Sequence, residues 1–312
     1  MLARLHTEYP DDLRVAYRHF PLMSIHDKAA LATQAAEAAG NQDNFWEMHK
    51  LLFENQSNWA AMTVDGFQAW LLEKATELNL DVKQFEADLN STALVELATK
   101  AWTESIELKI QQTPTLIING SEYKGQISYG NISAIIKLVL LEKRQFDVCP
   151  PIEIDPSKQY FANLETEKGT IVIQLLPEDA PLAVNNFVFL ARQGWFDNIT
   201  FHRVIAGFVA QTGDPSGTGY GSPGYAFDNE ISPDLIYDKA GTVGMANAGP
   251  GSNGSQFFIT MAPVEQLNGG YTIFGNVVEG MEVVESLTAR DPSQNIGLPP
   301  GDSLIKVTIL EK

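Results

Sequence analysis

The sequence predicts two domains of different class, an α/β domain followed by an all-β domain folded as a closed barrel. One reason is length, because 312 residues exceed the roughly 100–200 residues of an ordinary domain. Another is the segment "QFDVCPPIEIDPSKQ", residues 145–159, which is rich in proline and has little periodicity. At this segment the pattern changes from helical spacing to short strands between glycine and proline turns. We therefore expect domains at 1–144 and 160–312, with 145–159 as a linker.

Residues 1–144 show the pattern of an α/β domain with a long helical insertion. Apolar residues recur at helical spacing at residues 45–53, 64–78 and 81–89, and the segment 31–40 is an Ala-rich helical pattern that stops at Gly40. Strand-like stretches flank this block, at residues 13–20 ("LRVAYRHF"), 115–120 ("TLIING") and 121–128 ("SEYKGQIS"). The segment "NISAIIKLVLLEKR", residues 131–144, predicts an amphipathic helix that closes the domain.

Residues 160–312 show the pattern of a small barrel. The stretch 160–176 predicts two strands joined by a tight turn. A helix is expected over 180–194, because Pro181 lies near its first turn and Gly194 follows its last apolar position. Short strands follow, and the last is "LIKVTILEK" at the C-terminus.

Composition excludes several classes of protein. The net charge of −18 is spread over both halves, which indicates a solvated surface and argues against a nucleic-acid partner. Cys149 is the only cysteine, so the chain has no internal disulfide, no CxxC pair and no cysteine-rich zinc site. No apolar run approaches the ~20 residues of a transmembrane helix, and the start as written does not predict a signal peptide. The compartment and the oligomeric state do not follow from the sequence.

The densest chemical signal is one arginine surrounded by amides and rings. Three segments carry it: 201–219, 244–260 and 267–284. They contain neither a Ser-His-Asp arrangement nor a reactive cysteine, and His202 is the only histidine of this half. Arg203 stands among three amide side chains (Gln211, Asn247, Gln256) and three aromatic rings (Phe208, Phe258, Tyr271).

This set of side chains suits a reaction in which no bond is made. Rotation about an X-Pro amide has a barrier of roughly 18–20 kcal/mol, because the C–N bond has double-bond character. At the twisted transition state the proline nitrogen regains a lone pair, and a fixed donor such as a guanidinium stabilises it. That donor interacts more strongly with the twisted form than with the planar one, which is the requirement for catalysis.

At these residues the chain resembles the cyclophilin family of peptidyl-prolyl cis-trans isomerases, over about residues 160–312. The resemblance implies an eight-stranded antiparallel barrel with two helices. It implies that Arg203 is catalytic and that substrates are proline-containing unfolded or partly folded polypeptides, with no cofactor and no metal. The substrate-binding residues that it implies are Phe208, Val209, Gln211, Ala246, Asn247, Gln256, Phe258, Leu267 and Tyr271.

Some positions have simpler interpretations or depart from the family pattern. Gln266 stands where a tryptophan that helps to bind cyclosporin often lies, and Tyr271 where a histidine often lies, so cyclosporin sensitivity does not follow from the resemblance. We interpret His202 as structural and "GYGSPG", residues 219–224, as a loop. Taken singly, Phe208 and Phe258 are more typical of a core than of a pocket.

The first half resembles thioredoxin-fold disulfide oxidoreductases of the DsbA type, at residues 9–22, 35–56 and 113–125. In that family the bond equivalent to Thr113–Pro114 is cis and faces a CxxC. Here the CxxC and the strand before it are absent, so we expect that the sequence is truncated and that Met1 is an internal methionine. The alternative is a degenerate domain that a partner strand completes and that only binds peptides. An upstream start would make extracytoplasmic placement the expectation.

These observations predict a peptidyl-prolyl isomerase. Two alternatives stay open: a bifunctional folding factor with thiol-disulfide activity, if the true start lies upstream, and a peptide-binding chaperone module. Four other histidines lack metal-ligand spacing, and we expect surface or core roles for them: His6, His19, His26 and His49.

Overall fold

The computed structural model describes residues 1–293 and 299–312, and these form two compact units. One unit consists of residues 14–125, and the larger one combines 1–13 with 126–312. Within the larger unit, the segment 145–159 is attached by its own contacts, since the Phe146 N–H donates to the Pro223 carbonyl at 2.8 Å and the Asn185 side chain donates to the Pro151 carbonyl at 2.9 Å. The division into 1–144, 145–159 and 160–312 stays a prediction.

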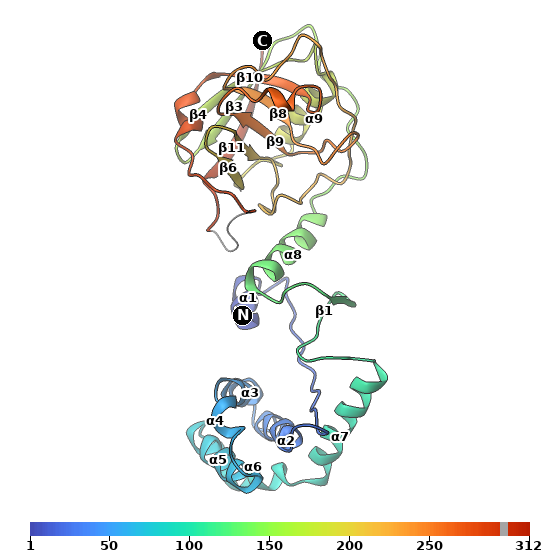
Figure 1. The fold of residues 1–312 in the computed structure, drawn as a ribbon, viewed down its shortest axis with the longest axis vertical. Coiled ribbons are helices and arrows are strands. Elements are labelled where there is room, and N and C mark those ends of the chain that lie inside the picture. The colour runs from blue at the N-terminus through green and yellow to red at the C-terminus, as the bar shows by residue number, and fades with distance from the viewer. Residues whose placement is uncertain (294–298) are drawn as a thin grey trace. The chain divides into compact units, whose positions relative to one another are not determined.

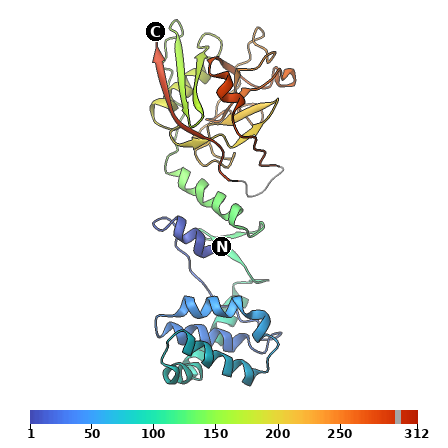
Figure 2. The same ribbon diagram turned by 90° about the vertical axis from the view of Figure 1, so that its left-hand side faces the viewer.

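The smaller unit is built mainly of helices, which pack side by side (Figure 1 and Figure 2). They are α2 (Ala29–Gly40), α3 (Phe45–Glu54), α4 (Gln56–Trp59), α5 (Val64–Glu77), α6 (Val82–Leu89) and α7 (Thr92–Glu107). The side chains of Thr63, Asp81 and Ser91 accept backbone N–H groups at the N-termini of α5, α6 and α7, as capping residues do. Phe67, Leu71 and other buried apolar residues form the core, so the helical segments predicted from periodicity are confirmed.

The strands of this unit are fewer than the sequence predicts. β1 (Leu116–Ile118) and β2 (Ser121–Tyr123) form an antiparallel hairpin, and Asn119 and Gly120 between them have φ of 48° and 83°. Such a pair of positive φ angles is typical of a two-residue hairpin turn. The predicted strand at 13–20 is wrong, because no strand of the described residues pairs with it. The Thr113–Pro114 bond is cis, and both residues are exposed.

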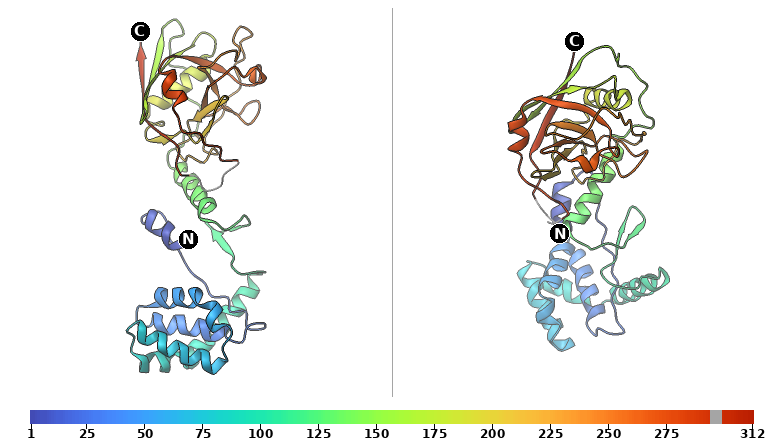
Figure 3. Two further views of the ribbon diagram at one scale, coloured as in Figure 1. Left: turned by 60° about the vertical axis from the view of Figure 1, so that its left-hand side comes forward. Right: turned by 45° about the horizontal axis from the view of Figure 1, so that its top comes forward.

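The larger unit is built on a curled sheet, and its helix α1 (Leu2–Glu8) lies beside α8 (Tyr129–Glu142), away from the sheet (Figure 1 and Figure 3). Its other helical elements are α9 (Pro181–Arg192), η1 (Glu265–Leu267) and α10 (Met281–Glu285). α9 is the helix expected over 180–194: Pro181 lies in its first turn, and Gly194 has φ 68° just after it. In α8, Leu141 is buried in the same core as the sheet.

The sheet has nine strands in the order β5-β11-β3-β4-β10-β8-β9-β7-β6. Their bounds are β3 (Tyr160–Thr166), β4 (Gly169–Leu175), β5 (Ile199–Thr200), β6 (Arg203–Ile205), β7 (Val209–Thr212), β8 (Thr242–Met245), β9 (Phe257–Thr260), β10 (Ile273–Glu279) and β11 (Ser303–Glu311). The structure therefore differs from the predicted closed barrel of eight strands. In the part of the chain that is described, no ladder joins the end strands β5 and β6. The reason is that both are very short and that Phe201 and His202 connect them directly, so the chain itself spans the gap.

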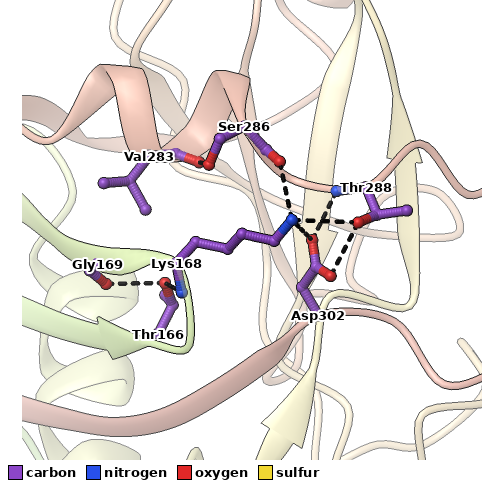
Figure 4. A network of polar contacts seen from close by, with 7 residues as sticks. All are labelled: Thr166, Lys168, Gly169, Val283, Ser286, Thr288 and Asp302. Atoms are coloured by element: carbon purple, nitrogen blue, oxygen red, sulfur yellow. Dashed lines mark hydrogen bonds and ion pairs between the residues drawn. The ribbon is translucent and has the colours of Figure 1, made fainter.

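A polar network ties the turn between β3 and β4 to the start of β11 (Figure 4). Lys168 Nζ donates to the Ser286 carbonyl at 3.2 Å and to Thr288 Oγ1 at 3.4 Å, and lies 3.6 Å from Asp302 Oδ2. Asp302 also accepts the Thr288 N–H at 2.6 Å. Burial opposes ionisation of Asp302, but the Thr288 hydrogen bonds and the Lys168 charge hold its pKa below the usual value.

Candidate active site

The arginine predicted to be catalytic begins a row of residues that crosses four neighbouring strands. Arg203 of β6 lies opposite Gln211 of β7, Gln211 opposite Phe258 of β9, and Phe258 opposite Gly244 of β8. Directly opposite residues share one face of a sheet. At Gly244 a Cβ would lie 2.6 Å from the Phe258 ring, so glycine leaves room for that ring.

The two faces of β7 and β9 serve different purposes. Ala210, Phe257 and Ile259 point to the main core, whereas Val209 and Phe258 belong to a second apolar cluster. The half-buried members of this second cluster include the other apolar residues predicted to bind substrate: Phe208, Ala246, Leu267 and Tyr271. The Phe258 and Tyr271 rings meet edge to face, with centroids 5.8 Å apart. The structure thus brings the predicted proline-binding residues together beside the Arg203 row.

A relay of amides leads away from the guanidinium. Arg203 Nη1 donates to Gln211 Oε1 at 3.4 Å, and Gln211 Nε2 donates to Gln256 Oε1 at 3.0 Å. The Arg203 Cζ lies 5.5 Å from the centroid of the Phe208 ring. Arg203 is half-buried, and a guanidinium has five N–H donors. It therefore has donor capacity beyond the bond to Gln211.

Two predicted groove residues make internal contacts. Asn247 Nδ2 donates to the Gly270 carbonyl at 3.1 Å and to Asn229 Oδ1 at 3.2 Å, so this side chain holds loops together. The Ala246 N–H donates to the Gln256 carbonyl at 2.9 Å. Within this site, the side chain of Asn247 and the N–H of Ala246 are therefore engaged by the protein itself.

His202 is a buried neighbour of the site. It is 3% exposed, and neither ring nitrogen has a hydrogen-bond partner in the described part of the chain. Burial lowers the pKa of His202 to about 4, although the Asp214 carboxylate opposes the shift. The ring is therefore neutral at pH 7, in keeping with a structural role.

Sequence reasoning missed one residue near the site. Asp214 is fully buried, and it holds the loop that contains the "GYGSPG" stretch, which is irregular as predicted. Nothing in the local sequence marks this aspartate, since Asp-Pro-Ser is an ordinary turn sequence.

A cavity of about 160 Å³ lies in the unit of residues 14–125. Three of the remaining histidines line it: His19, His26 and His49. His19 Nε2 lies 2.9 Å from Glu37 Oε1, yet burial lowers the pKa of His19. Across residues 1–293 and 299–312, no three His, Cys, Asp or Glu side chains gather as a metal site requires. Within the same residues, no helix has both the length and the apolar character needed to cross a membrane.

Comparison with known proteins decides the family. Residues 161–309 match the family model described as cyclophilin type peptidyl-prolyl cis-trans isomerase/CLD. Peptidyl-prolyl cis-trans isomerase B of Streptomyces anulatus is 41% identical over 172 residues, which are 50% of this chain and 98% of that protein. The chain belongs to the cyclophilin-type peptidyl-prolyl cis-trans isomerases. Another relative, peptidyl-prolyl cis-trans isomerase ppi1 of Schizosaccharomyces pombe, is 50% identical over 127 residues, which are 40% of this chain and 82% of that protein.

The N-terminal part of this cyclophilin has its own match. Residues 1–138 match the family model described as thioredoxin, so a thioredoxin-like domain precedes the isomerase domain.

Among solved structures, a cyclophilin type isomerase from Cryptosporidium parvum, studied in the presence of the dipeptide Ala-Pro, is 37% identical and has a TM-score of 0.45. The match covers 49% of this chain and 99% of that one. The two family-model matches and the Streptomyces anulatus relative confirm both predicted resemblances, at the level of a cyclophilin type domain and a thioredoxin-like domain.

Proposed function

We propose that this cyclophilin isomerises X-Pro bonds of unfolded or partly folded polypeptides at Arg203. The observation that supports this proposal is the position of the guanidinium, in the same strand row as Phe258 and next to the apolar cluster. The pyrrolidine ring of a substrate proline would lie against Phe208, Val209, Phe258 and Leu267. The second Nε2–H of Gln211, with the backbone at Ala246 and Asn247, would hold the flanking peptide, and Gln256 would line the groove beside it.

The role of Arg203 follows from the electronic change during rotation. A planar X-Pro amide has no basic nitrogen, whereas the twisted amide has a lone pair that accepts a hydrogen bond. An N–H of Arg203 beside the bound proline therefore stabilises the transition state more than the ground state. Gln211 accepts one N–H of the guanidinium, which limits its rotation. Because no electron or group is transferred, the reaction needs no cofactor.

The test is the isomerisation rate of a proline-containing peptide with Arg203→Ala. We expect kcat/KM to fall by ~10²–10³, on the scale of losing one preorganised donor at an oxyanion hole. Arg192→Ala is the matched control, because Arg192 is an arginine at the end of α9 whose charge pairs with Glu311 at 3.4 Å. Wild-type kcat/KM in a folded Arg203→Ala protein would refute the proposed role.

A second candidate function is polypeptide binding by the unit of residues 14–125. The observation that favours it is the 160 Å³ cavity, whose lining includes Tyr17, Phe53 and Trp59, next to the segment 13–20, with which no strand of the described residues pairs. Phe53 is 59% exposed, so Phe53→Ser should weaken suppression of client aggregation without unfolding the protein. If aggregation of the client is still suppressed by Arg203→Ala and equally well by Phe53→Ser, this cavity is not the binding site.

With Cys149 as the only cysteine, no thiol pair supports disulfide exchange within this chain.

A further inference from the structure

The tripeptide Asp-Pro-Ser occurs three times in the chain, beginning at Asp155, Asp214 and Asp291. Each aspartate accepts hydrogen bonds through Oδ1 from the serine two residues later. The backbone N–H distances are 3.0, 2.8 and 3.0 Å, and the hydroxyl distances are 2.7, 2.6 and 2.6 Å, in chain order. The three turns are therefore locally alike, and Asp214 is the fully buried one, at 0% exposed.

The second carboxylate oxygen distinguishes Asp214. Its Oδ2 accepts the N–H groups of Gly219 at 2.7 Å, Gly221 at 3.0 Å and Thr218 at 3.1 Å. Because three backbone N–H groups of one loop converge on this oxygen, it fixes the path of the loop. The approach is close, because a Cβ on Gly221 would lie 2.0 Å from the other carboxylate oxygen.

The same two glycines then hold Gln256 through their carbonyls. Gln256 Nε2 donates to the Gly219 and Gly221 carbonyls, both at 3.0 Å. Their N–H groups thus bind Asp214, while their carbonyl groups bind Gln256. With its NH₂ group committed to two carbonyls, the Gln256 amide must turn Oε1 the other way, toward Gln211.

The orientation of each amide sets that of the next. Since Gln211 Nε2 donates to Gln256 Oε1, Gln211 presents Oε1 to Arg203, where it accepts from Nη1. Reversal of either amide would place N–H against N–H, and a donor facing a donor loses the bond. The position of the loop that Asp214 holds therefore sets the orientation of the Arg203 guanidinium, through the side chains of Gln256 and Gln211.

We propose that Asp214 is a positioning residue of the isomerase site, acting through Gln256 and Gln211 to orient Arg203. This inference rests on the proposed role of Arg203. Asp214 does not touch the substrate, because it is buried beneath the loop that it holds. Small misplacements of a catalytic group reduce rates strongly, so a residue outside the groove affects catalysis by this route.

The test is a double-mutant cycle on kcat/KM with Asp214→Ala and Gln256→Leu. We expect each single change to lower kcat/KM about tenfold. This loss is smaller than the ~10²-fold loss in rate that a 1 Å misplacement of a catalytic group causes. If Asp214 acts through Gln256, the double variant should be no worse than the worse single variant. Losses that multiply to about a hundredfold would overturn the relay, and so would wild-type kcat/KM in Asp214→Ala.

Asp155→Ala is the matched control, because it removes the same local turn bonds from an exposed site. We expect its kcat/KM to equal that of the wild type. A loss in Asp155→Ala as large as in Asp214→Ala would overturn the proposal, since any Asp-Pro-Ser turn would then have the same effect.

Two further variants keep the outcome interpretable. Should Asp214→Ala fail to fold, Asp214→Asn replaces it in the cycle, because asparagine keeps one oxygen but turns N–H groups toward the remaining donors. Its expected loss is about threefold, the scale of one hydrogen bond, with no further loss from Gln256→Leu. Arg203→Ala separates the two proposals. If this variant keeps the wild-type kcat/KM, the catalytic role of Arg203 is refuted. If it loses most of its kcat/KM while the losses in the double-mutant cycle multiply, only the relay from Asp214 is refuted.

Discussion

The two segments 13–20 and 209–212 both have the composition of strands, yet only the second forms one. Val209–Thr212 lies between β6 and β9 and pairs with both. Residues 13–20 contain the strand-favouring Val15, Tyr17 and Phe20 but have no ladder partner in the described structure. A helix satisfies its backbone within one segment, whereas a strand needs a second segment. The helical segments of residues 14–125 therefore follow from local sequence, and the strands depend on distant partners.

The largest predicted effect is a loss of stability in the core of the helical unit, residues 14–125. Phe67 is fully buried and stacks on Trp59 and Trp70, with centroids 4.6 and 5.9 Å away. Phe67→Ala should lower the free energy of unfolding of this unit by about 4 kcal/mol, because it leaves a cavity. Isomerase kcat/KM should not change, since the proposed site lies in the other unit.

Circular dichroism in denaturant and a proline-peptide assay measure the two effects separately. Val64→Ala, at a 41% exposed position of the same helix, is the control and should change stability little. Activity that falls in step with the helical signal of Phe67→Ala would show that the two units depend on each other.

The next largest predicted effect is the pH dependence of the stability of the isomerase unit. The folded-state pKa of His202 is lowered to about 4, whereas an unfolded histidine titrates near 6.5. Between these values the unfolded chain binds the extra proton, so stability falls as pH decreases from 6.5 to 4 and is constant above 6.5 for this group. The difference amounts to about 3 kcal/mol.

His202→Phe keeps a ring of similar size and cannot take up this proton. Denaturant unfolding at pH 7.5 and pH 4.5 should show a smaller loss of stability in the variant than in the wild type. Other titrating groups are common to both proteins and cancel in that difference. Equal losses in the two proteins would mean that His202 is accessible to protons in the folded state.

The smallest predicted effect is the loss of stability on removing the N-terminal cap of helix α6. The Asp81 side chain caps α6 by accepting the Lys83 and Gln84 N–H groups at 3.0 and 3.1 Å. Asp81→Ala should cost about 1 kcal/mol of stability in the helical unit, the usual value for a lost cap. Glu86→Ala, at an exposed position of the same helix, should cost less in the same thermal denaturation experiment. An equal cost for the two changes would contradict the capping role of Asp81.

The helices followed from short-range patterns and the family from motifs, whereas the roles of the residues around Arg203 stay predictions that rest on the family resemblance. Sequence reasoning predicted a strand at 13–20 because alternation does not reveal whether a partner exists. The expectation of eight strands came from the family resemblance, and nothing in the sequence marks the break at Phe201 and His202 that separates β5 from β6. Sequence reasoning overlooked Asp214 for a similar reason, since three Asp-Pro-Ser turns look alike until burial distinguishes them.

The short end strands of the sheet affect how this enzyme meets its substrates. A polypeptide that presents an X-Pro bond also presents free backbone N–H and C=O groups, and a long open sheet edge would capture them. β5 has two residues and β6 has three, and Val204 of β6 exchanges backbone hydrogen bonds with Arg290. These ends offer an unfolded chain too few backbone groups to add a strand of its own. Because a client polypeptide cannot pair with the ends of the sheet, it binds at the groove alone and dissociates after isomerisation, as turnover requires.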